Sequence, residues 1–167
     1  MYLKTLSMLF LCFLGVEVCT AQSMGQLQNK NTVITPYKDQ SYVIGQEWGI
    51  GKIVERKKKR RDKVYNMVKV VPGLANPDLV SFALSVEPDL YLRHQNAQLK
   101  WHKSDGSNLF KADATFRIIR GFTGENTVSF VSTNYPTYYI SLKNGKELWV
   151  VENPNPEDAS FLLEVEQ

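Results

Sequence analysis

A run of six consecutive basic residues is the strongest charged feature of the sequence. It consists of Arg56, Lys57, Lys58, Lys59, Arg60 and Arg61. Because unpaired charges are costly to bury, the run predicts an exposed loop between two strands. Such a loop can attract a polyanion, for example a sulfated glycosaminoglycan or an acidic matrix, by counterion release and pairing with sulfate. A solvated loop without a ligand is the simpler alternative, and a processing site with cleavage after Arg61 is a third.

Residues that could support catalysis do not form a catalytic pattern. His102 has no thiol partner in the segment expected to fold, because both cysteines lie among the first 20 residues. The sequence contains no Gly-x-Ser-x-Gly elbow and no cluster with the spacing of metal ligands. Glu87, Asp89 and Asp105 could in principle supply a glycosidase pair, but they fall in turn-like segments. The sequence therefore predicts a non-enzyme that needs no cofactor.

The elements that would position these residues come from an internal repeat. Three landmarks recur at a spacing of 48 positions: Phe82 and Phe130, Tyr91 and Tyr139, and Trp101 and Trp149. A more divergent upstream copy occupies roughly residues 37–76, where Tyr42-Val43-Ile44 matches Tyr91-Leu92-Arg93. A spacing held across several landmarks indicates repeated supersecondary units. The sequence thus predicts three copies of one unit.

Each copy reads as four short strands. In the second copy the candidates are Val80–Val86, Leu90–Arg93, Ala97–His102 and Ala114–Ile119, with turn residues such as Asp105-Gly106 between them. Three such units are too few for a propeller of four-stranded blades. They predict an all-β fold, a β-trefoil of three four-stranded repeats. The expected core residues are Phe82, Leu84, Phe116, Ile118, Phe130 and Phe161.

The amino-terminal part predicts export. Residues 1–21 combine a positive start, an apolar run and a small-residue end, which is typical of a secretory signal peptide. Residues 22–38 are expected to be a polar tail, and residues 39–167 the folded domain. No later stretch approaches the length of about 20 apolar residues that a membrane-spanning helix needs. We expect a secreted, extracellular protein without a membrane span.

Two longer blocks resemble a known family. Tyr91-Leu92-Arg93-His94 and the string from Ser104 to Phe116, which ends in Asp113-Ala114-Thr115-Phe116, are similar to the arabinose-binding domain (AbfB domain) of α-L-arabinofuranosidase B. Val71-Pro72-Gly73-Leu74-Ala75 looks like another block of that family. The resemblance implies a non-catalytic β-trefoil that holds arabinofuranose side chains of polysaccharides in shallow pockets, one in each copy.

The resemblance also implies which residues bind sugar. In that family the histidine of the first block and the aspartate of the second line the pocket, and these residues correspond here to His94 and Asp113. The third copy keeps Asp158 but has Leu142 at the histidine position, and the first copy is assigned Gly45 and Tyr65. A carboxylate and an imidazole suit sugar hydroxyls, which donate and accept hydrogen bonds. Tyr91 could cover one face of the ring, although packing is the simpler role for it.

Two functions follow as expectations. The first is a lectin-like, carbohydrate-binding module that uses Tyr91, His94, Asp113 and Asp158 for an arabinofuranose-like or other neutral sugar. The alternative is an extracellular matrix or signalling protein that binds sulfated or acidic polyanions, such as heparin, through residues 56–61. The formal net charge of +3 does not by itself select a partner, and no nucleic acid is expected.

Overall fold

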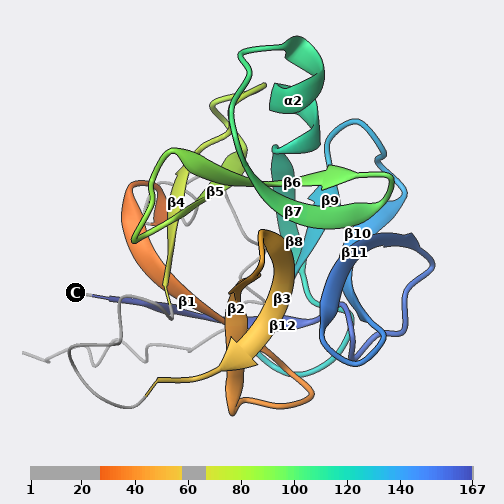
Figure 1. The fold of residues 1–167 in the computed structure, drawn as a ribbon. Helices are drawn as coiled ribbons and strands as arrows, with labels where there is room; N and C mark the ends of the chain where they lie inside the picture. Colours follow the sequence, from red (N-terminus) through yellow and green to blue (C-terminus); the bar gives the residue numbers. More distant parts are fainter. Residues whose placement is uncertain (1–26, 58–66, 167) are drawn as a thin grey trace, which may run out of the picture.

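The computed structural model describes residues 27–57 and 67–166, which form twelve strands and the short helix α2 (Figure 1). The strands fall into three consecutive sets of four. The first set is β1 (Lys30–Pro36), β2 (Tyr42–Glu47), β3 (Ile50–Glu55) and β4 (Val68–Pro72); the second is β5 (Val80–Leu84), β6 (Leu90–Gln95), β7 (Gln98–Lys103) and β8 (Phe116–Arg120); the third is β9 (Val128–Ser132), β10 (Tyr138–Lys143), β11 (Glu147–Glu152) and β12 (Phe161–Val165). The expected all-β class is confirmed.

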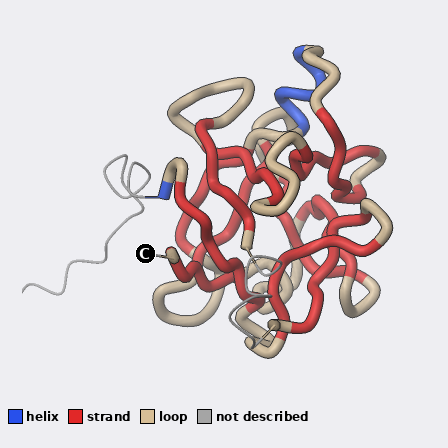
Figure 2. The backbone as a smooth tube through the Cα atoms, turned by 60° about the vertical axis from the view of Figure 1, so that its left-hand side comes forward, coloured by secondary structure: helices blue, strands red, loops and turns tan. Residues whose placement is uncertain are grey.

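The outer strands of the three sets close into a ring. Antiparallel pairing runs from β1 to β4, β5, β8, β9 and β12, and β12 pairs back to β1. The inner strands form three hairpins, β2–β3, β6–β7 and β10–β11. These hairpins contact one another through β3, β7 and β11. Most of the tube in Figure 2 is accordingly strand.

Three equivalent hydrogen bonds show the threefold relation between the hairpins. The amide of Trp101 donates to the Gly49 carbonyl at 2.8 Å, and the amide of Val150 donates to the Ala97 carbonyl at 2.8 Å. The amide of Ile53 donates to the Lys146 carbonyl at 2.9 Å, which completes the cycle. Each hairpin turn is therefore held by a strand of the next repeat. The three repeats depend on one another for these backbone partners.

Aromatic side chains fill the centre of the ring. The predicted core residues Phe82, Phe116, Phe130 and Phe161 are all buried, as are Leu84 and Ile118. The rings of Phe82 and Phe130 meet edge to face, with centroids 5.1 Å apart. Ile34 of β1 occupies the position of Phe82 and Phe130 in the first repeat and is also buried. Apolar burial of this kind is the main stabilising contribution in a domain whose described part has no disulfide.

The strand register corrects one detail of the repeat. The β10–β11 turn has one residue more than the other two hairpin turns, because Lys143 pairs with Glu147 whereas Gln95 pairs with Gln98. Trp101 is therefore equivalent to Val150, and not to Trp149 as the spacing of 48 positions suggests. The burial agrees, since Trp101 and Val150 are both buried while Trp149 is half-buried. The indole of Trp101 donates to the Gly45 carbonyl at 2.9 Å.

The folded domain starts earlier than the sequence suggested. The expected polar tail ended at residue 38, whereas β1 (Lys30–Pro36) is an integral strand that pairs with both β4 and β12. Its β-branched stretch Thr32-Val33-Ile34-Thr35 is fully buried. Because short polar segments lie on either side of this strand, the composition alone did not indicate it. The predicted signal peptide, residues 1–21, lies outside the described residues.

Helix α2 (Asn108–Asp113) projects from the second repeat (Figures 1 and 2). Ser107 caps it, since its hydroxyl accepts a hydrogen bond of 3.0 Å from the Phe110 amide. Phe110 is buried and anchors the helix to the strands beneath. The predicted strand from Ala114 begins only at Phe116, because the helix extends to Asp113 and Ala114 follows as its cap. In the part of the chain that is described, no helix is long and apolar enough to cross a bilayer.

Candidate sugar-binding pocket

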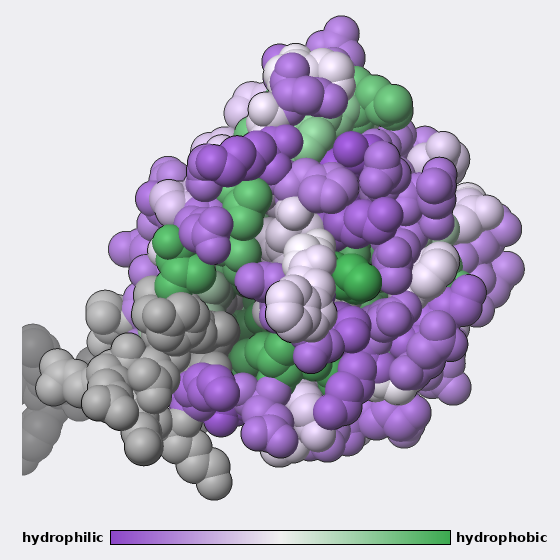
Figure 3. All heavy atoms as spheres, in the orientation of Figure 1, coloured by the Kyte–Doolittle hydropathy of each residue, from purple (hydrophilic) through white to green (hydrophobic). Residues whose placement is uncertain are grey.

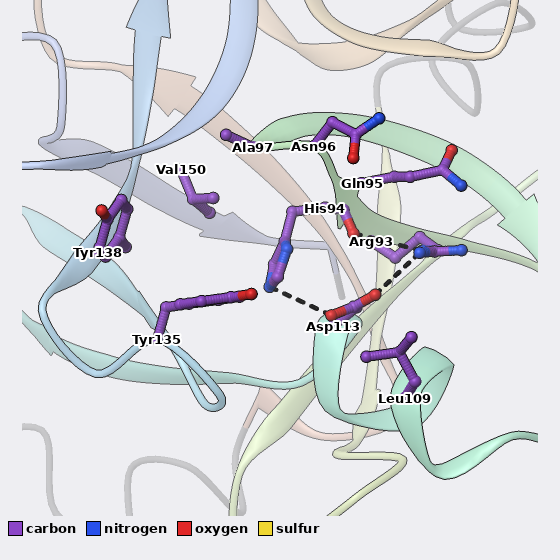
Figure 4. Close-up of a pocket in the computed structure, with 10 residues that line it drawn as sticks. All are labelled: Arg93, His94, Gln95, Asn96, Ala97, Leu109, Asp113, Tyr135, Tyr138 and Val150. Atoms are coloured by element: carbon purple, nitrogen blue, oxygen red, sulfur yellow. Dashed lines mark hydrogen bonds and ion pairs between the residues drawn. The ribbon is translucent and has the colours of Figure 1, made fainter.

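A cavity that contains His94 and Asp113 lies between the second and third repeats. It has a volume of about 480 Å³. Its lining comes from β6 and the following turn, from α2, and from the third repeat: Arg93, His94, Gln95, Asn96, Ala97, Leu109, Asp113, Tyr135, Tyr138 and Val150. Figure 4 shows the His94 ring and the Asp113 carboxylate turned toward each other across this space. The two residues that the sequence assigned to one site are thus brought together.

His94 is held at its Nε2 atom by two residues of the third repeat. Nε2 lies 2.9 Å from Asn134 Oδ1 and 3.0 Å from Ser132 Oγ. Burial lowers the pKa of His94 below its usual value, and the hydrogen bond to Asn134 and the charge of Asp113 oppose this only in part. The imidazole is therefore neutral at pH 7. Asn134 Oδ1 can only accept a hydrogen bond, so the proton of the neutral ring lies on Nε2. Nδ1 is then left as an acceptor.

Asp113 is the centre of the polar network. Its Oδ2 accepts a hydrogen bond of 2.8 Å from Arg93, and its Oδ1 accepts one of 2.7 Å from the Asn134 amide. His94 Nε2 lies 3.7 Å from the same Oδ1. The Arg93 guanidinium also stacks over the Phe110 ring at 5.2 Å. The buried carboxylate is thus neutralised and fixed, while each of its oxygens keeps a lone pair for a ligand.

Aromatic and aliphatic side chains form the rim of the pocket. Tyr135 is 51% exposed, and its ring meets His94 edge to face at 5.3 Å. Tyr138 lies 5.7 Å from Tyr135 between ring centroids. Leu109 of α2 is also exposed, and it lines the cavity together with Asp113. The pocket therefore combines polar groups on the inside with apolar faces at its edge, as sites for small polar ligands commonly do.

The sequence did not single out three of the residues that complete the site. Asn134 and Tyr135 come from a neighbouring repeat, and Arg93 was read only as part of a motif. The tripeptide Asn134-Tyr135-Pro136 has residue types that are typical of a turn. Its contact with the second repeat follows from ring closure through β8 and β9, which the sequence does not display.

Tyr91 does not line this pocket, although it was a candidate for covering the sugar. It lies in β6 directly opposite His102, on the face of the strand that alternates with His94. Adjacent side chains of a strand point to opposite faces, so Tyr91, three residues before His94, lies on the other face of β6. It is not among the residues that line the cavity. The structure places Tyr135 beside His94 instead.

Asp158 lies in the equivalent position of the third repeat. Its carboxylate accepts a hydrogen bond of 3.2 Å from Lys38 Nζ, and Lys38 occupies the position that Asn134 has in the main pocket. Leu142 stands where His94 would be, and its amide donates to the Asp158 carbonyl at 2.9 Å. This location therefore keeps a carboxylate but has no imidazole, and a lysine replaces the amide.

The first repeat departs further from the pattern. The β2–β3 register places Gln46, and not Gly45, in the position of His94, because Glu47 pairs with Ile50 as Gln95 pairs with Gln98. The Gln46 side chain accepts a hydrogen bond of 3.0 Å from the Gly49 amide within its own turn. Tyr65, assigned to the aspartate position, lies outside the described residues.

Only the first two residues of the basic run are described. Arg56 forms an ion pair with Glu164 of β12. Lys58, Lys59, Arg60 and Arg61 lie outside the described residues, so their part in polyanion binding stays a prediction. Arg56 follows β3 directly, so the run starts in the β3–β4 connection as expected.

Two of the acidic residues considered for a catalytic pair, Asp89 and Asp105, have structural partners. Asp89 lies 2.7 Å from Lys103 Nζ, and Asp105 Oδ1 accepts a hydrogen bond of 2.8 Å from the Ser107 amide ahead of α2. Both carboxylates stabilise connections at the surface. Within residues 27–57 and 67–166, no three His, Cys, Asp or Glu side chains are grouped as metal ligands.

Comparison with known proteins identifies the family. The family described as "Alpha-L-arabinofuranosidase B (ABFB) domain" matches residues 31–163, and the chain belongs to it. The "Arabinofuranosidase/B-xylosidase" of Trichoderma koningii is 38% identical over 81 residues, which are 48% of this chain and 16% of that protein. The "Alpha-L-arabinofuranosidase B" of Emericella nidulans is 43% identical over 60 residues, 36% of this chain and 12% of that protein. The matches thus span under a fifth of these enzymes.

Solved structures give the same fold. An arabinofuranosidase complexed with arabinofuranosyl-alpha-1,2-xylobiose aligns with 82% of this chain and 31% of its own, at a TM-score of 0.76 and 24% identity. The earthworm R-type lectin C-half in complex with GalNAc aligns over 82% of this chain and 99% of its own (TM-score 0.59, 10% identity). The BEL beta-trefoil aligns over 83% of this chain and 94% of its own (TM-score 0.63, 14% identity). These likenesses support a β-trefoil.

Proposed function

We propose that this protein is a non-catalytic carbohydrate-binding module that holds one neutral sugar, an arabinofuranose or a sugar of similar shape, in the pocket of His94 and Asp113. The observation that carries the proposal is the fixed network of Arg93, His94, Asp113 and Asn134 beside the exposed ring of Tyr135. Membership of the arabinofuranosidase B domain family and the likeness to a sugar-bound lectin support it.

The arrangement suits hydroxyl groups better than a charged ligand. Asp113 provides strong acceptor sites, whereas Arg93 and Asn134 provide donors. The formal charges of Arg93 and Asp113 cancel within the pocket, and neutral His94 adds none at pH 7. A neutral polyol therefore meets paired donors and acceptors without a net charge. The Tyr135 ring offers a surface for the apolar face of the sugar.

A single pocket of this size predicts weak binding. A monosaccharide has few non-hydrogen atoms, so its dissociation constant is expected to be about millimolar. Leu142 and Lys38 have replaced two of the pocket groups in the third repeat, which removes the gain that several equal sites would supply. We propose extracellular action on polysaccharide, in keeping with the predicted signal peptide.

The test is calorimetric titration with an arabinofuranosyl oligosaccharide. Asp113→Asn removes the acceptor charge at nearly constant volume, and it should weaken binding at least tenfold, because hydrogen bonds to charged groups contribute about 1.5–3 kcal/mol. Asp158→Asn is the matched control, and its affinity should equal that of the unmodified protein. Equal affinities for all three proteins would overturn the assignment of the pocket.

Salt separates this function from the polyanion alternative. Binding of a neutral sugar should persist between low and high ionic strength, whereas binding to a sulfated glycan through residues 56–61 should weaken strongly. Retention on heparin that is lost at high salt, and lost when residues 56–61 are neutralised, would support the alternative. Sugar binding that disappears with salt would contradict the neutral pocket.

A further inference from the structure

Trp48 is the most exposed large apolar side chain among the described residues. It is 93% exposed and stands at the tip of the β2–β3 hairpin, which lies in front in Figure 1. Its backbone has φ of +55°, and Gly49 follows with +76°. A two-residue turn with positive φ at both positions favours Asn and Gly, whereas a bulky side chain there is disfavoured. The local backbone conformation therefore does not favour a tryptophan at this position.

The strand register relates Trp48 to the sugar pocket. The β2–β3 and β6–β7 hairpins have the same length and pairing, so Trp48 is equivalent to Asn96. Asn96 lines the pocket of the second repeat. In the first repeat, Gln46 replaces His94 and turns its amide toward Gly49. The place in the first repeat that is equivalent to the pocket therefore has no imidazole. It presents the exposed indole of Trp48 instead.

The surroundings of Trp48 are polar. The preceding residue, Glu47, is exposed and lies 2.7 Å from Lys52 Nζ of the facing strand. Figure 3 shows a mainly hydrophilic surface on this side of the molecule, with only separate hydrophobic areas. A stable protein interface needs about 800 Å² on each partner, and one tryptophan supplies about 150–250 Å². The indole is therefore better matched to one flat ring than to a protein surface.

We propose that Trp48 is a second sugar contact, an aromatic platform on which one ring of a polysaccharide main chain stacks while a side-chain sugar of the same polymer occupies the His94 pocket. The inference rests on the proposed function, since it assumes a glycan ligand. One stacked ring binds weakly by itself. Joined to the pocket through the polymer, it acts at high effective concentration and raises the apparent affinity.

The Trp48→Asn variant tests the platform without endangering the fold. Asparagine is the residue of the equivalent turn position Asn96 and is favoured at positive φ, so the thermal midpoint should be unchanged or higher. The affinity for soluble arabinoxylan or branched arabinan should fall about tenfold through lost bivalency. The affinity for methyl α-L-arabinofuranoside should not change. Phe122→Ala, which removes a half-exposed aromatic from another loop, is the control and should leave both affinities unchanged.

Tryptophan fluorescence adds a direct readout. In the Asp113→Asn background, saturating polymer should still reduce iodide quenching of Trp48 and shift its emission to shorter wavelength. Unchanged polymer affinity in Trp48→Asn, with monosaccharide binding intact, would overturn the platform and leave the pocket standing. If the unmodified protein did not bind the monosaccharide at all, the proposed function itself would be contradicted. Self-association that disappears in Trp48→Asn would show a contact between copies and overturn the platform.

Discussion

Asn134 donates a hydrogen bond of 2.7 Å to Asp113, and this contact joins the third repeat to the second inside the pocket. The same amide group accepts from His94 at 2.9 Å, so one side chain fixes both residues that the sequence had singled out. The pocket is consequently a property of the closed ring, since no single repeat contains all of its polar groups.

Removal of Asn134 should therefore affect both stability and binding. Asn134→Ala leaves Asp113 and His94 each short of a buried partner, which is expected to lower the free energy of unfolding by about 1–3 kcal/mol. Sugar affinity should fall with it. Urea unfolding and calorimetry measure the two effects. Lys38→Ala removes the residue equivalent to Asn134, which the first repeat supplies to Asp158 of the third. Because this ion pair is exposed, the effect on stability should stay within about 1 kcal/mol, with no change in affinity.

Replacement of His94 by leucine reproduces the third repeat, where Leu142 holds the equivalent place. His94→Leu should fold, because a leucine side chain is accommodated at the sister position. It should bind no sugar at concentrations up to about ten times the dissociation constant of the unmodified protein, since the imidazole contact is gone. Calorimetry provides the measurement. Sugar binding at full strength in a folded His94→Leu protein would show that the ligand lies elsewhere.

Stability should fall on mild acidification because of His94. Burial lowers the pKa of His94 in the folded protein, whereas an unfolded histidine titrates at about 6.5. Below about pH 6.5 the unfolded chain therefore binds a proton that the folded protein binds only at lower pH. The free energy of unfolding should decrease there by up to about 1.4 kcal/mol per pH unit, and it should be level above pH 7.

The second histidine must be removed to isolate this effect. His94 and His102 are the two histidines of the chain, and burial lowers the pKa of His102 as well. Chemical denaturation between pH 5 and 8 should show the decrease in His102→Asn and a nearly level profile in the His94→Asn, His102→Asn double variant. A steep acid decrease in the double variant would assign the effect to other groups.

The corrected register predicts different roles for two tryptophans. Trp101→Phe should destabilise the fold by about 1–3 kcal/mol, because it removes the indole donor to the buried Gly45 carbonyl and part of the core packing. Trp149→Phe should cost less than about 1 kcal/mol, because Trp149 lies half-buried beside Lys143. Thermal unfolding compares the two variants. Equal losses would favour the equivalence suggested by the 48-residue spacing.

Much of the architecture could be predicted from the sequence because its signals are local and periodic. Phe82 and Phe130 marked the repeated strands, and turn residues marked their ends. The first strand was missed because Thr32 and Thr35 flank only two apolar residues, although both threonines are buried by pairing with β12. Burial that arises from pairing with a strand as distant in the sequence as β12 leaves no local pattern.

The candidate site was predictable only in part for the same reason. His94 and Asp113 lie in recognisable blocks, but Asn134 and Tyr135 meet them through pairing of β8 with β9. Tyr91 was considered as an aromatic cover for the sugar ring, yet it lies on the other face of β6 from His94 and does not line the pocket. Contacts between repeats depend on ring closure and register, which one copy of the repeat does not specify.

The most direct test of the account is amide chemical-shift mapping of the protein during titration with methyl α-L-arabinofuranoside. The pocket predicts perturbations centred on His94, Asp113 and Tyr135 that saturate near millimolar concentration. The sister location at Lys38, Leu142 and Asp158 should remain unchanged. Perturbations centred on that location, or no saturable change at either place, would contradict the assignment of sugar binding to the pocket between the second and third repeats.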